Sequence, residues 1–481
     1  MFGKEKLSGE TKARLVKNGK QLANRVEYKD LLSPTSNPMT TMFHLATASY
    51  EKRKHVFTAD FPNAYLKVDR SKHGMPKEYT RLTGKLAKLV CEEEPDYLKY
   101  MHNGSLFLEI KKSVYGLTES AALWFKELSE MLQQQGYKRQ DADPCLFIHP
   151  EHKAAVNIHV DDCMCSCRDD ASAEMLKKFF EKHKCRILQD EFLFLGMDVR
   201  HDKDKTIYLS MHTFLKDKLA NMGVIGTEKY PHKASLLDED KTSLLSEADR
   251  TNYVSRVMCL MYAGLRTRFD TLFTLSCLSM HCQSPTQKNM DDLDHLLRYL
   301  NGTMKREIRL KPQTMDIQVY VDASFMLHPD RKGHTGCFVT LGIMGPCIGA
   351  RSSKQKMIVL SSTEGEVLAV FESLPLLSTA AALSKAFGYN SVPILHQDNK
   401  SAIEMMHAGG GSSKHTKHFD LRLRYIQAMI QDHALEVQHL GTEDMPADHL
   451  SKTTIGKRYD SCMETLMGAV AATHVESEIA M

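Results

Sequence analysis

The sequence predicts a multidomain protein of mixed class, with an α+β N-terminal part, a helical middle part and an α/β C-terminal part. Three observations predict this. The 481 residues suffice for roughly three domains of ordinary size. Short alternating apolar runs and amphipathic segments mix in the first half, and helical periods fill 240–305. From Asp316 onward strands precede helices, which indicates a separate α/β domain.

Composition excludes several classes of protein. Hydrophobic residues make up 42% and charged residues 26%, without a run of about 18 apolar residues, so we expect no membrane partner. The residues after Met1 lack the apolar core of a secretory signal, so we expect a cytoplasmic or nuclear protein that is not secreted. Because the net charge is only +3, any affinity for nucleic acid must come from local basic surface.

The first elements along the chain can be read from periodicity. Residues 1–55 are polar and basic, which is typical of a solvated face. From Thr118, apolar residues recur at helical spacing until Gly136, so we predict a helix whose apolar stripe lies in the core. The stripe comprises Ala121, Trp124, Phe125, Leu128, Met131 and Leu132.

A hairpin is predicted around the pair Asp161-Asp162. Val156, Ile158 and Val160 alternate before the pair, and Cys163, Cys165 and Cys167 alternate after it. The cysteine spacing fits neither a zinc site nor a secreted disulfide framework, so we interpret these thiols as one buried face of a strand.

Carboxylates at strand ends carry the candidate chemistry of this first half. Asp161 and Asp162 lie at the hairpin tip, and Asp60 closes a short strand that contains Val56 and Phe57. Transfer of phosphoryl or nucleotidyl groups uses two metal ions, and Mg²⁺ prefers such oxygen ligands. Taken alone, an Asp-Asp pair is more often a turn former.

A second set of carboxylates follows in the C-terminal part. Asp322 follows the strand IQVYV, Asp398 follows PILHQ, Glu366 lies in the first turns of a helix, and Asp448 lies near the last helical segment. Glu366 shares a helix face with Ala369 and Val370, the side expected to pack on the sheet. Glu364 is the alternative, although with Ser361 it also fits a capping box.

Four ordered blocks resemble the reverse transcriptase of copia-type (Pseudoviridae-like) retrotransposon polyproteins. They are HVFTADFPNAYL, the segment from EIKKSVYGLTES to DADPCLF, NIHVDD and FLFLGMDV. KARLVKNG, LLSPT and YLNGT resemble further parts of the same region. The resemblance implies a polymerase domain with palm and fingers in 1–235, a helical connection or thumb-like region in 236–311, and a ribonuclease H-like domain with a C-terminal tail in 312–481.

The resemblance also implies roles for individual residues. Asp60, Asp161 and Asp162 would bind Mg²⁺ and be catalytic. Tyr65 would place its ring against the sugar of the incoming dNTP, with core packing as the alternative, and Tyr115 and Gly116 would form the template and nucleotide-binding turn. Leu195 and Gly196 would hold the primer end. A basic group, Arg14 or Lys12, is expected at the triphosphate.

The sequence departs from the family pattern at two places. His159 stands where tyrosine is usual, and Ser120-Ala121 stands where Ser-Pro is usual. Neither change removes a metal ligand. His159 could alter the position of the primer, and a role as a metal ligand is the weaker reading because magnesium sites are rich in oxygen.

Residues 316–452 resemble a copia-type ribonuclease H through YVDAS, STEGEVLAV, HQDNKSAI, TKHFDLRLRYI and TEDMPADHLSK. The resemblance makes Asp322, Glu366, Asp398 and Asp448 a second, catalytic Mg²⁺ site. Lys400, Lys414 and Lys417 are candidates for contact with the hybrid backbone, and ordinary solvated lysine is the alternative. His439 and His449 do not clearly match the mobile histidine of some ribonucleases H, and neither receives a role.

The sequence therefore predicts an RNA-directed DNA polymerase with ribonuclease H activity. The expected partners are an RNA template, a DNA primer, the RNA–DNA hybrid and dNTPs. The capsid, protease and integrase parts of such a polyprotein are not found in these 481 residues. The alternatives are a decayed or domesticated remnant that binds nucleic acid, or a protein in which only ribonuclease H is active. The presence of all seven carboxylates disfavours a remnant.

Overall fold

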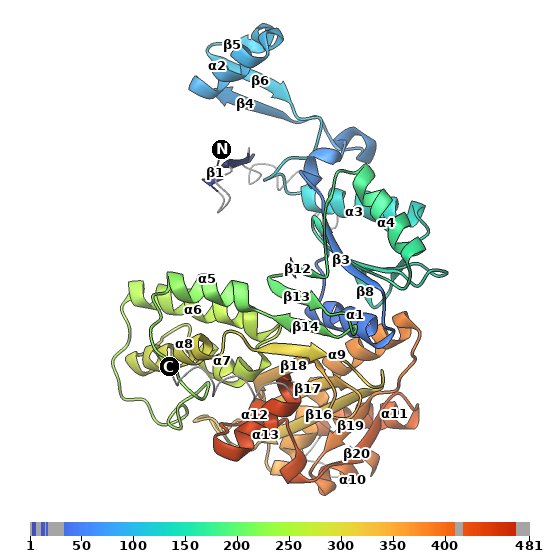
Figure 1. Cartoon of the computed structure of the whole chain (residues 1–481). Helices are drawn as coiled ribbons and strands as arrows, with labels where there is room; N and C mark the ends of the chain where they lie inside the picture. The colour runs from blue at the N-terminus through green and yellow to red at the C-terminus, as the bar shows by residue number, and fades with distance from the viewer. Residues whose placement is uncertain (1, 6–10, 15, 18–32, 409–416, 468–481) are drawn as a thin grey trace, which may run out of the picture.

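The computed structural model describes residues 2–5, 11–14, 16–17, 33–408 and 417–467. Figure 1 shows the sheet that contains β3 and β8 in the upper half, and the sheet that contains β16 and β19 in the lower half. The described helices and strands are mixed throughout, which confirms the α+β and α/β class predicted from the sequence.

A six-stranded antiparallel sheet forms the centre of the upper half, in the order β11-β3-β10-β9-β8-β7. The hairpin predicted from the alternating pattern is confirmed as β9 and β10. The strands are β3 (His55–Asp60), β7 (Lys138–Gln140), β8 (Asp143–Ile148), β9 (Ala155–His159), β10 (Asp162–Cys167) and β11 (Arg186–Gln189).

Helices α3 (Ser120–Gln134) and α4 (Asp170–Lys182) cover one face of this sheet. The predicted helix before Gly136 is therefore confirmed, and Gly136 adopts a left-handed φ of 87° just after its end. Trp124 and Leu128 lie in the core with Phe57 of β3, whereas Leu123 is more deeply buried than the expected Phe125 and Met131. Cys163, Cys165 and Cys167 are free, buried thiols in the same core, as predicted.

Helix α1 (Pro38–Tyr50) covers the other face and corrects the reading of residues 1–55 as a solvated face. Eleven consecutive residues, Met39 to Ser49, are buried. The Asn37 side chain caps the helix by accepting from the Met39 amide, and Phe43 stacks on Phe387 at 5.6 Å between ring centroids. The helix is buried all round because it lies between two domains, so it shows no amphipathic period.

Two small sheets lie toward the N-terminus. The strands β4 (Tyr79–Thr83), β6 (Ser105–Glu109) and β5 (Met101–His102) form one of them, with α2 (Gly84–Glu93). It has its own small core, which includes Leu82 and Leu106, and extends away from the remaining sheets at the top of Figure 1. The strands β1 (Phe2–Glu5) and β2 (Thr11–Arg14) form the other.

A four-stranded antiparallel sheet joins the upper half to a helical region. Its strands are β12 (Glu191–Phe194), β13 (Met197–His201), β14 (Ile207–Ser210) and β15 (Glu307–Leu310). Because β15 pairs with β14, this sheet contains strands from both sides of the boundary expected at residue 235. The predicted helical segment consists of α6 (Glu247–Gly264), α7 (Leu272–Ser279) and α8 (Gln287–Gly302), and α5 (His212–Asn221) precedes it.

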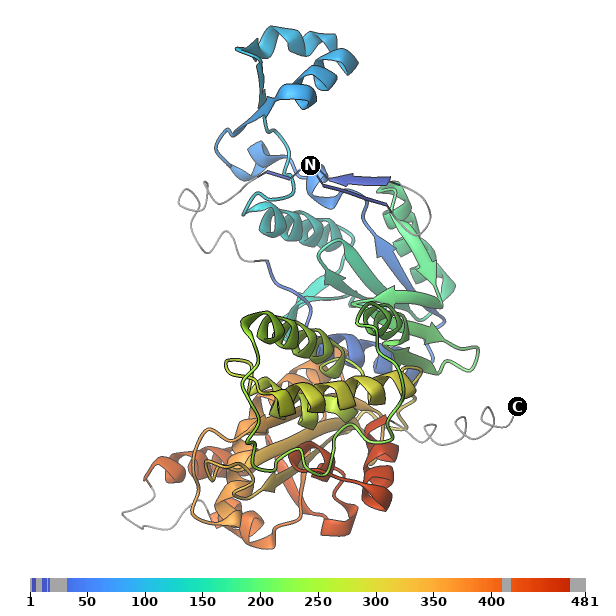
Figure 2. The ribbon, with the colours of Figure 1, turned by 90° about the vertical axis from the view of Figure 1, so that its left-hand side faces the viewer.

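The C-terminal domain is a five-stranded mixed sheet in the order β18-β17-β16-β19-β20. β16 (Ile317–Ser324), β17 (His334–Leu341) and β18 (Cys347–Lys354) are antiparallel, whereas β19 (Ile394–Gln397) and β20 (Glu436–His439) run parallel to β16. Figure 2 shows this domain as the orange and red lower part. Its helices are α9 (Ser362–Phe387), α10 (Lys400–Ala408), α11 (Lys417–Gln431), α12 (Asp448–Ser451) and α13 (Gly456–Met467).

Helix α9 is apolar and long enough to cross a membrane, judged by length and composition alone. However, 56% of its most apolar window is buried inside the protein, where Val367 and Val370 join the core. This is the behaviour of a core helix on which a sheet packs.

Candidate active sites

The first candidate site lies at the tip of the β9–β10 hairpin. Asp60 at the end of β3 and Asp162 at the start of β10 are directly opposed in the antiparallel register. The backbone of the tip is fixed by two hydrogen bonds. The Phe61 amide donates to the Asp161 carbonyl at 2.9 Å, and the Trp124 indole donates to the Val160 carbonyl at 2.6 Å. Asp161 follows Val160, which has a left-handed φ of 57°.

Negative charge accumulates at this tip. Burial, followed by the charges of Asp161 and Asp60, raises the pKa of Asp162 to about 6. A cation bound there would favour the ionised carboxylate, and grouped oxygen ligands suit Mg²⁺. The residues therefore fit a metal site, although their carboxylate oxygens do not all lie within 4.8 Å of one another, as those of the second site described below do.

Tyr65 and Tyr115 form a pair beside the tip. Tyr65 lies in a short 3₁₀ helix, Ala64–Lys67, and its ring is tilted against that of Tyr115 at a centroid distance of 4.9 Å. Burial, followed by the charges of Asp161 and Tyr115, raises the pKa of Tyr65. Tyr65 is half-buried, so the structure brings it to the carboxylates without enclosing it in the core.

Gly116 occupies a position where only glycine fits. Its φ is 89°, and a Cβ atom there would lie 2.0 Å from the Lys17 carbonyl oxygen. This close approach exists because the Lys17 amide donates to the Tyr115 carbonyl at 2.9 Å. The predicted triphosphate contact, Arg14 or Lys12, falls at β2, and the side chains of both residues lie outside the described part of the structure.

Leu195 and Gly196 form the turn between β12 and β13, with φ values of 53° and 76°. Their partner could not be predicted from the sequence. Tyr262 of α6 donates its hydroxyl hydrogen to the Leu195 carbonyl at 2.8 Å, and a Cβ on Gly196 would approach the Tyr262 ring to 3.1 Å. The turn predicted to hold the primer is therefore fixed by the helical region.

His159 precedes the hairpin tip and is half-buried. Burial, followed by the charge of Arg266, lowers the pKa of His159, and the charge of Asp161 opposes the shift. A neutral imidazole is thus favoured near neutral pH. Its Nδ1 atom is buried without a hydrogen-bond partner among the described residues.

The second candidate site lies on the five-stranded sheet of the C-terminal domain. Asp322 of β16, Glu366 of α9 and Asp398 after β19 each place a carboxylate oxygen within 4.8 Å of the other two. Asp322 and Glu366 are buried and Asp398 is half-buried. The parallel pairing of β16 and β19 brings the carboxyl ends of these strands to one edge, which accounts for the convergence.

The alternative residue Glu364 does not join this group. The Ser361 hydroxyl accepts from the Glu364 amide at 3.2 Å, and the Glu364 carboxylate accepts from the Leu360 amide at 2.7 Å. Glu364 thus serves the N-terminus of α9. Glu366 instead accepts from the Gln397 amide group at 3.1 Å, inside the site.

Burial and mutual repulsion raise the pKa values of two carboxylates at the second site. Burial raises the pKa of Asp322 to about 6 despite the nearby charge of Lys452, and Asp448 and Asp398 add to the rise. Burial, followed by the charges of Asp322 and Asp398, raises the pKa of Glu366 well above its usual range. Two buried carboxylates with raised pKa values, together with the half-buried Asp398, fit the ligand set of a Mg²⁺ ion.

Asp448, the fourth predicted carboxylate, is held by two cations. Lys452 lies 2.8 Å from one carboxylate oxygen of Asp448, and Arg458 lies 2.7 Å from the other. Lys452 also lies 3.7 Å from Asp322, and the Ser451 hydroxyl donates to Asp322. The sequence reasoning missed Lys452 and Arg458, because only the fold brings their charges to the carboxylates.

The remaining candidates are less informative. Lys400 is exposed at the start of α10, Lys414 lies outside the described residues, and so does the side chain of Lys417. His449 is buried and bonded to Thr454 and to the Asp270 carbonyl, so it has a structural role. His439 is exposed on β20.

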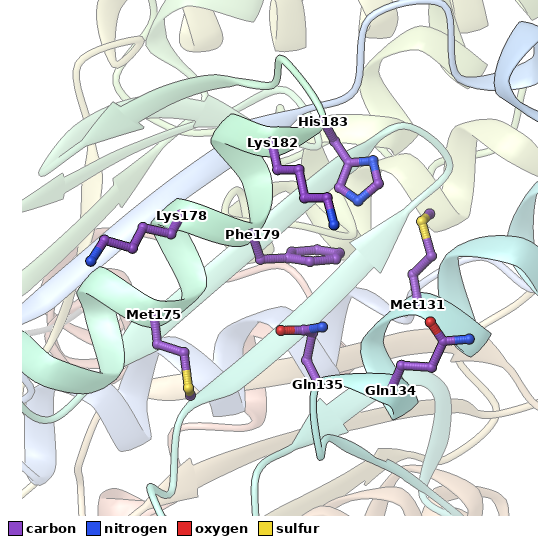
Figure 3. A pocket seen from close by; sticks show the side chains of 8 residues that line it. All are labelled: Met131, Gln134, Gln135, Met175, Lys178, Phe179, Lys182 and His183. Carbon is purple, nitrogen blue, oxygen red and sulfur yellow. The ribbon is translucent and has the colours of Figure 1, made fainter.

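A cavity of about 420 Å³ lies between α3 and α4, lined by Met131, Gln134, Gln135, Met175, Lys178, Phe179, Lys182 and His183. Figure 3 shows Lys182, His183 and Phe179 on α4 and its end, with Gln134 and Gln135 from α3 across the space. None of the carboxylates of either candidate site lines it, so we do not assign the chemistry to this cavity.

The first half of the chain is similar to a known protein family. Residues 3–234 match the family described as reverse transcriptase (RNA-dependent DNA polymerase). The chain is 25% identical over 467 residues to the retrovirus-related Pol polyprotein from transposon TNT 1-94 of Nicotiana tabacum, covering 94% of this chain and 34% of that protein. It is 26% identical over 450 residues to that from transposon RE1 of Arabidopsis thaliana, covering 92% and 29%.

The chain thus spans about a third of the length of the curated relatives that it matches. Among solved structures, a foamy viral protease-reverse transcriptase in complex with dsDNA gives a TM-score of 0.50 at 13% identity, covering 92% of this chain and 77% of that one. A second structure of that protein, also with dsDNA, gives 0.52 at 12% identity, covering 92% and 64%. At these identities the similarity shows a shared fold.

Proposed function

We propose that this chain, whose residues 3–234 match a reverse transcriptase family and which is similar to the Pol polyproteins of copia-type retrotransposons, copies RNA into DNA and cleaves the RNA of the resulting hybrid. Its proposed substrates are a primed RNA template, dNTPs and the RNA–DNA hybrid, and its proposed location is the cytoplasm or nucleus.

One observation carries the proposal. The chain holds two clusters of carboxylates on two different sheets. One cluster lies at the end of β3 and the β9–β10 tip, and the other lies around Asp322. The first cluster lies at the ends of β3 and β10, whereas Asp322 lies inside β16, Glu366 near the start of α9 and Asp398 just after β19. Bound Mg²⁺ would neutralise the attacking and leaving oxygens of a phosphate in either place.

For DNA synthesis, we assign Asp60, Asp161 and Asp162 to hold the metal ions. The Tyr65 ring would bound the sugar of the incoming dNTP, because it lies beside Asp161 and is supported by Tyr115. The turn of Leu195 and Gly196 would support the primer end. Its rigid attachment to Tyr262 suits a positioning role, since catalysis requires the reacting atoms to be held closely.

For RNA cleavage, we assign Asp322, Glu366 and Asp398 to hold the metal ions. Asp448 would complete the ligand set once its ion pair with Lys452 is broken. Gln397 orients two of these residues. It donates to Glu366, and its carbonyl oxygen accepts from the Asp398 amide at 2.8 Å. A fixed ligand set of this kind lowers the cost of organising the site on binding.

One specific observation favours the alternative in which only ribonuclease H is active. In the described part of the chain, the carboxylates of the C-terminal site converge within 4.8 Å, whereas those of the hairpin site do not. His159 stands where tyrosine is usual, which also favours this alternative.

Both functions can be tested on the purified chain with Mg²⁺. A labelled DNA primer on an RNA template reports extension, and a labelled RNA strand in a preformed hybrid reports cleavage. We expect both products. Cleavage without extension supports the single-activity alternative, and loss of both with retained hybrid binding supports a binding remnant.

A further inference from the structure

Arg266 lies just after the end of α6 and is fixed on Tyr262. Its guanidinium carbon is 3.4 Å from the centroid of the Tyr262 ring, and its Nη1 donates to the Tyr262 carbonyl at 2.9 Å. Tyr262 itself is bonded to the Leu195 carbonyl. The guanidinium group of Arg266 is therefore held in one orientation, unlike that of a freely moving surface arginine.

The charge of Arg266 has no acidic partner among the described residues. Other arginines of the same region are paired: Arg256 lies 3.5 Å from Asp294, and Arg268 lies 2.7 Å from Asp270. For Arg266 no carboxylate lies within 4.0 Å in the described ranges, and its Nε is buried without a hydrogen-bond partner there. Burial lowers its pKa, which shows that its charge is incompletely solvated.

The charge of Arg266 lies beside the Leu195-Gly196 turn, to which the proposed function assigns the primer end. Tyr262, on which Arg266 stacks, donates its hydroxyl hydrogen to the Leu195 carbonyl, and its ring closely approaches Gly196. Arg266 thus lies where the helical region meets the turn between β12 and β13.

A half-buried cation without an acidic partner is a poor stabiliser of the fold but a good ligand for a polyanion. Guanidinium groups form paired hydrogen bonds to phosphate, and such bonds are stronger where water is partly excluded. A primer end held at the Leu195-Gly196 turn would bring its last phosphates close to Arg266, since successive phosphates of one strand advance by about 3.4 Å along the helix axis.

We propose that Arg266 binds a backbone phosphate of the primer strand, close to its 3′ end. The inference rests on the proposed polymerase function and adds a residue to it. Arg266 is a positioning residue: it would hold the strand against the Leu195-Gly196 turn while Asp161 and Asp162 meet the terminal hydroxyl.

The test measures binding and needs no catalysis. Binding of a fluorescent primer–template duplex is followed by anisotropy, without Mg²⁺, at several salt concentrations. Each phosphate contact contributes about 0.9 to the slope of log K against log salt. We expect Arg266→Gln to reduce the slope by about this amount and to weaken binding roughly tenfold at low salt. Arg266→Lys should keep most of the slope, because the charge remains.

Arg256→Gln is the matched control. It removes a charge from α6, the helix that precedes Arg266, but that charge is already paired with Asp294, so the slope should be unchanged. Thermal unfolding of each variant checks that the fold is intact. An unchanged slope for Arg266→Gln would show that the arginine only stacks on Tyr262, and would overturn the inference.

Single neutral methylphosphonates locate the contact. When the phosphate that Arg266 binds is replaced, wild type and Arg266→Gln should bind equally, and we expect this at one of roughly the last three primer linkages. If wild type and Arg266→Gln bind equally only when a phosphate of the template strand is replaced, the assignment to the primer is overturned. If the wild-type chain binds no duplex at all, the proposed polymerase function fails as well, so the two failures are distinguishable.

Discussion

Asp60 and Asp162 face each other across β3 and β10 as directly paired residues of an antiparallel ladder. Side chains at such a pair lie on the same face of the sheet, and like charges there are destabilising. Burial, followed by the charges of Asp161 and Asp60, raises the pKa of Asp162 to about 6. A cation between the carboxylates would relieve this repulsion, which is why we propose that the metal ions of DNA synthesis bind here.

Tyr65→Val is expected to let the polymerase incorporate ribonucleotides. The ring of Tyr65 is braced by Tyr115 beside Asp161, so its removal opens space for a 2′-hydroxyl. The ratio of kcat/KM for a dNTP to that for the matching rNTP should fall by roughly 10- to 200-fold, the range for one steric contact. Tyr65→Phe keeps the ring and should keep the discrimination. An unchanged ratio in Tyr65→Val would make Tyr65 a packing residue.

The metal-free C-terminal site should lose stability as the pH rises. The pKa of Asp322 is about 6 in the folded protein, above its usual 3.8, so the folded state holds this proton more tightly than the unfolded state. Its contribution to the free energy of unfolding is present at low pH and is lost between about pH 4 and 6, on the order of 3 kcal/mol. Glu366 acts in the same direction.

Urea unfolding of wild type and Asp322→Asn in chelator isolates this contribution. Asparagine does not titrate, so the difference in unfolding free energy should shift in favour of the variant as the pH rises through this window. A difference that is independent of pH between 4 and 7 would contradict the assigned environment of Asp322.

Lys452→Met is expected to tighten Mg²⁺ binding at the C-terminal site. The ammonium group lies 2.8 Å from Asp448 and 3.7 Å from Asp322, so it already occupies part of the negative field that a metal ion would use. Its removal should increase the Mg²⁺ affinity roughly tenfold, measured by calorimetry, and lower the stability of the metal-free protein.

Lys457→Met is the control for this substitution. Lys457 is exposed on α13 and forms no ion pair with the residues that the structure describes, so its loss should leave the Mg²⁺ affinity unchanged. Unchanged or weaker binding in Lys452→Met would show that the lysine does not compete with the metal.

Much of the fold was predictable from local pattern. The β9–β10 hairpin follows from strict alternation on both sides of Asp161-Asp162, and α3 follows from its helical period up to Gly136. The positions of Asp60, Asp162 and Asp398 were predictable for the same reason, whereas Asp322, expected after its strand, lies inside β16, which continues to Ser324.

Contacts between distant segments were not predictable. Helix α1 is buried by the C-terminal domain, and its sequence carries no sign of this because all of its faces are covered. The helix face favoured Glu366 over Glu364 already in the sequence, but their partners, Gln397 for Glu366 and the Leu360 amide for Glu364, needed the structure. The contacts of Tyr262, Arg266 and Lys452 likewise depend on residues far apart in sequence.

The central claim is that one chain holds two separate metal-dependent active sites. It is tested most directly by measuring primer extension and hybrid cleavage in parallel for Asp161→Asn and Asp398→Asn, with thermal unfolding as the check on folding. We expect Asp161→Asn to abolish extension and keep cleavage, and Asp398→Asn to abolish cleavage, keep extension and unfold no earlier than wild type without Mg²⁺. Equal loss of both activities in either variant, or retained cleavage by Asp398→Asn, would contradict the account.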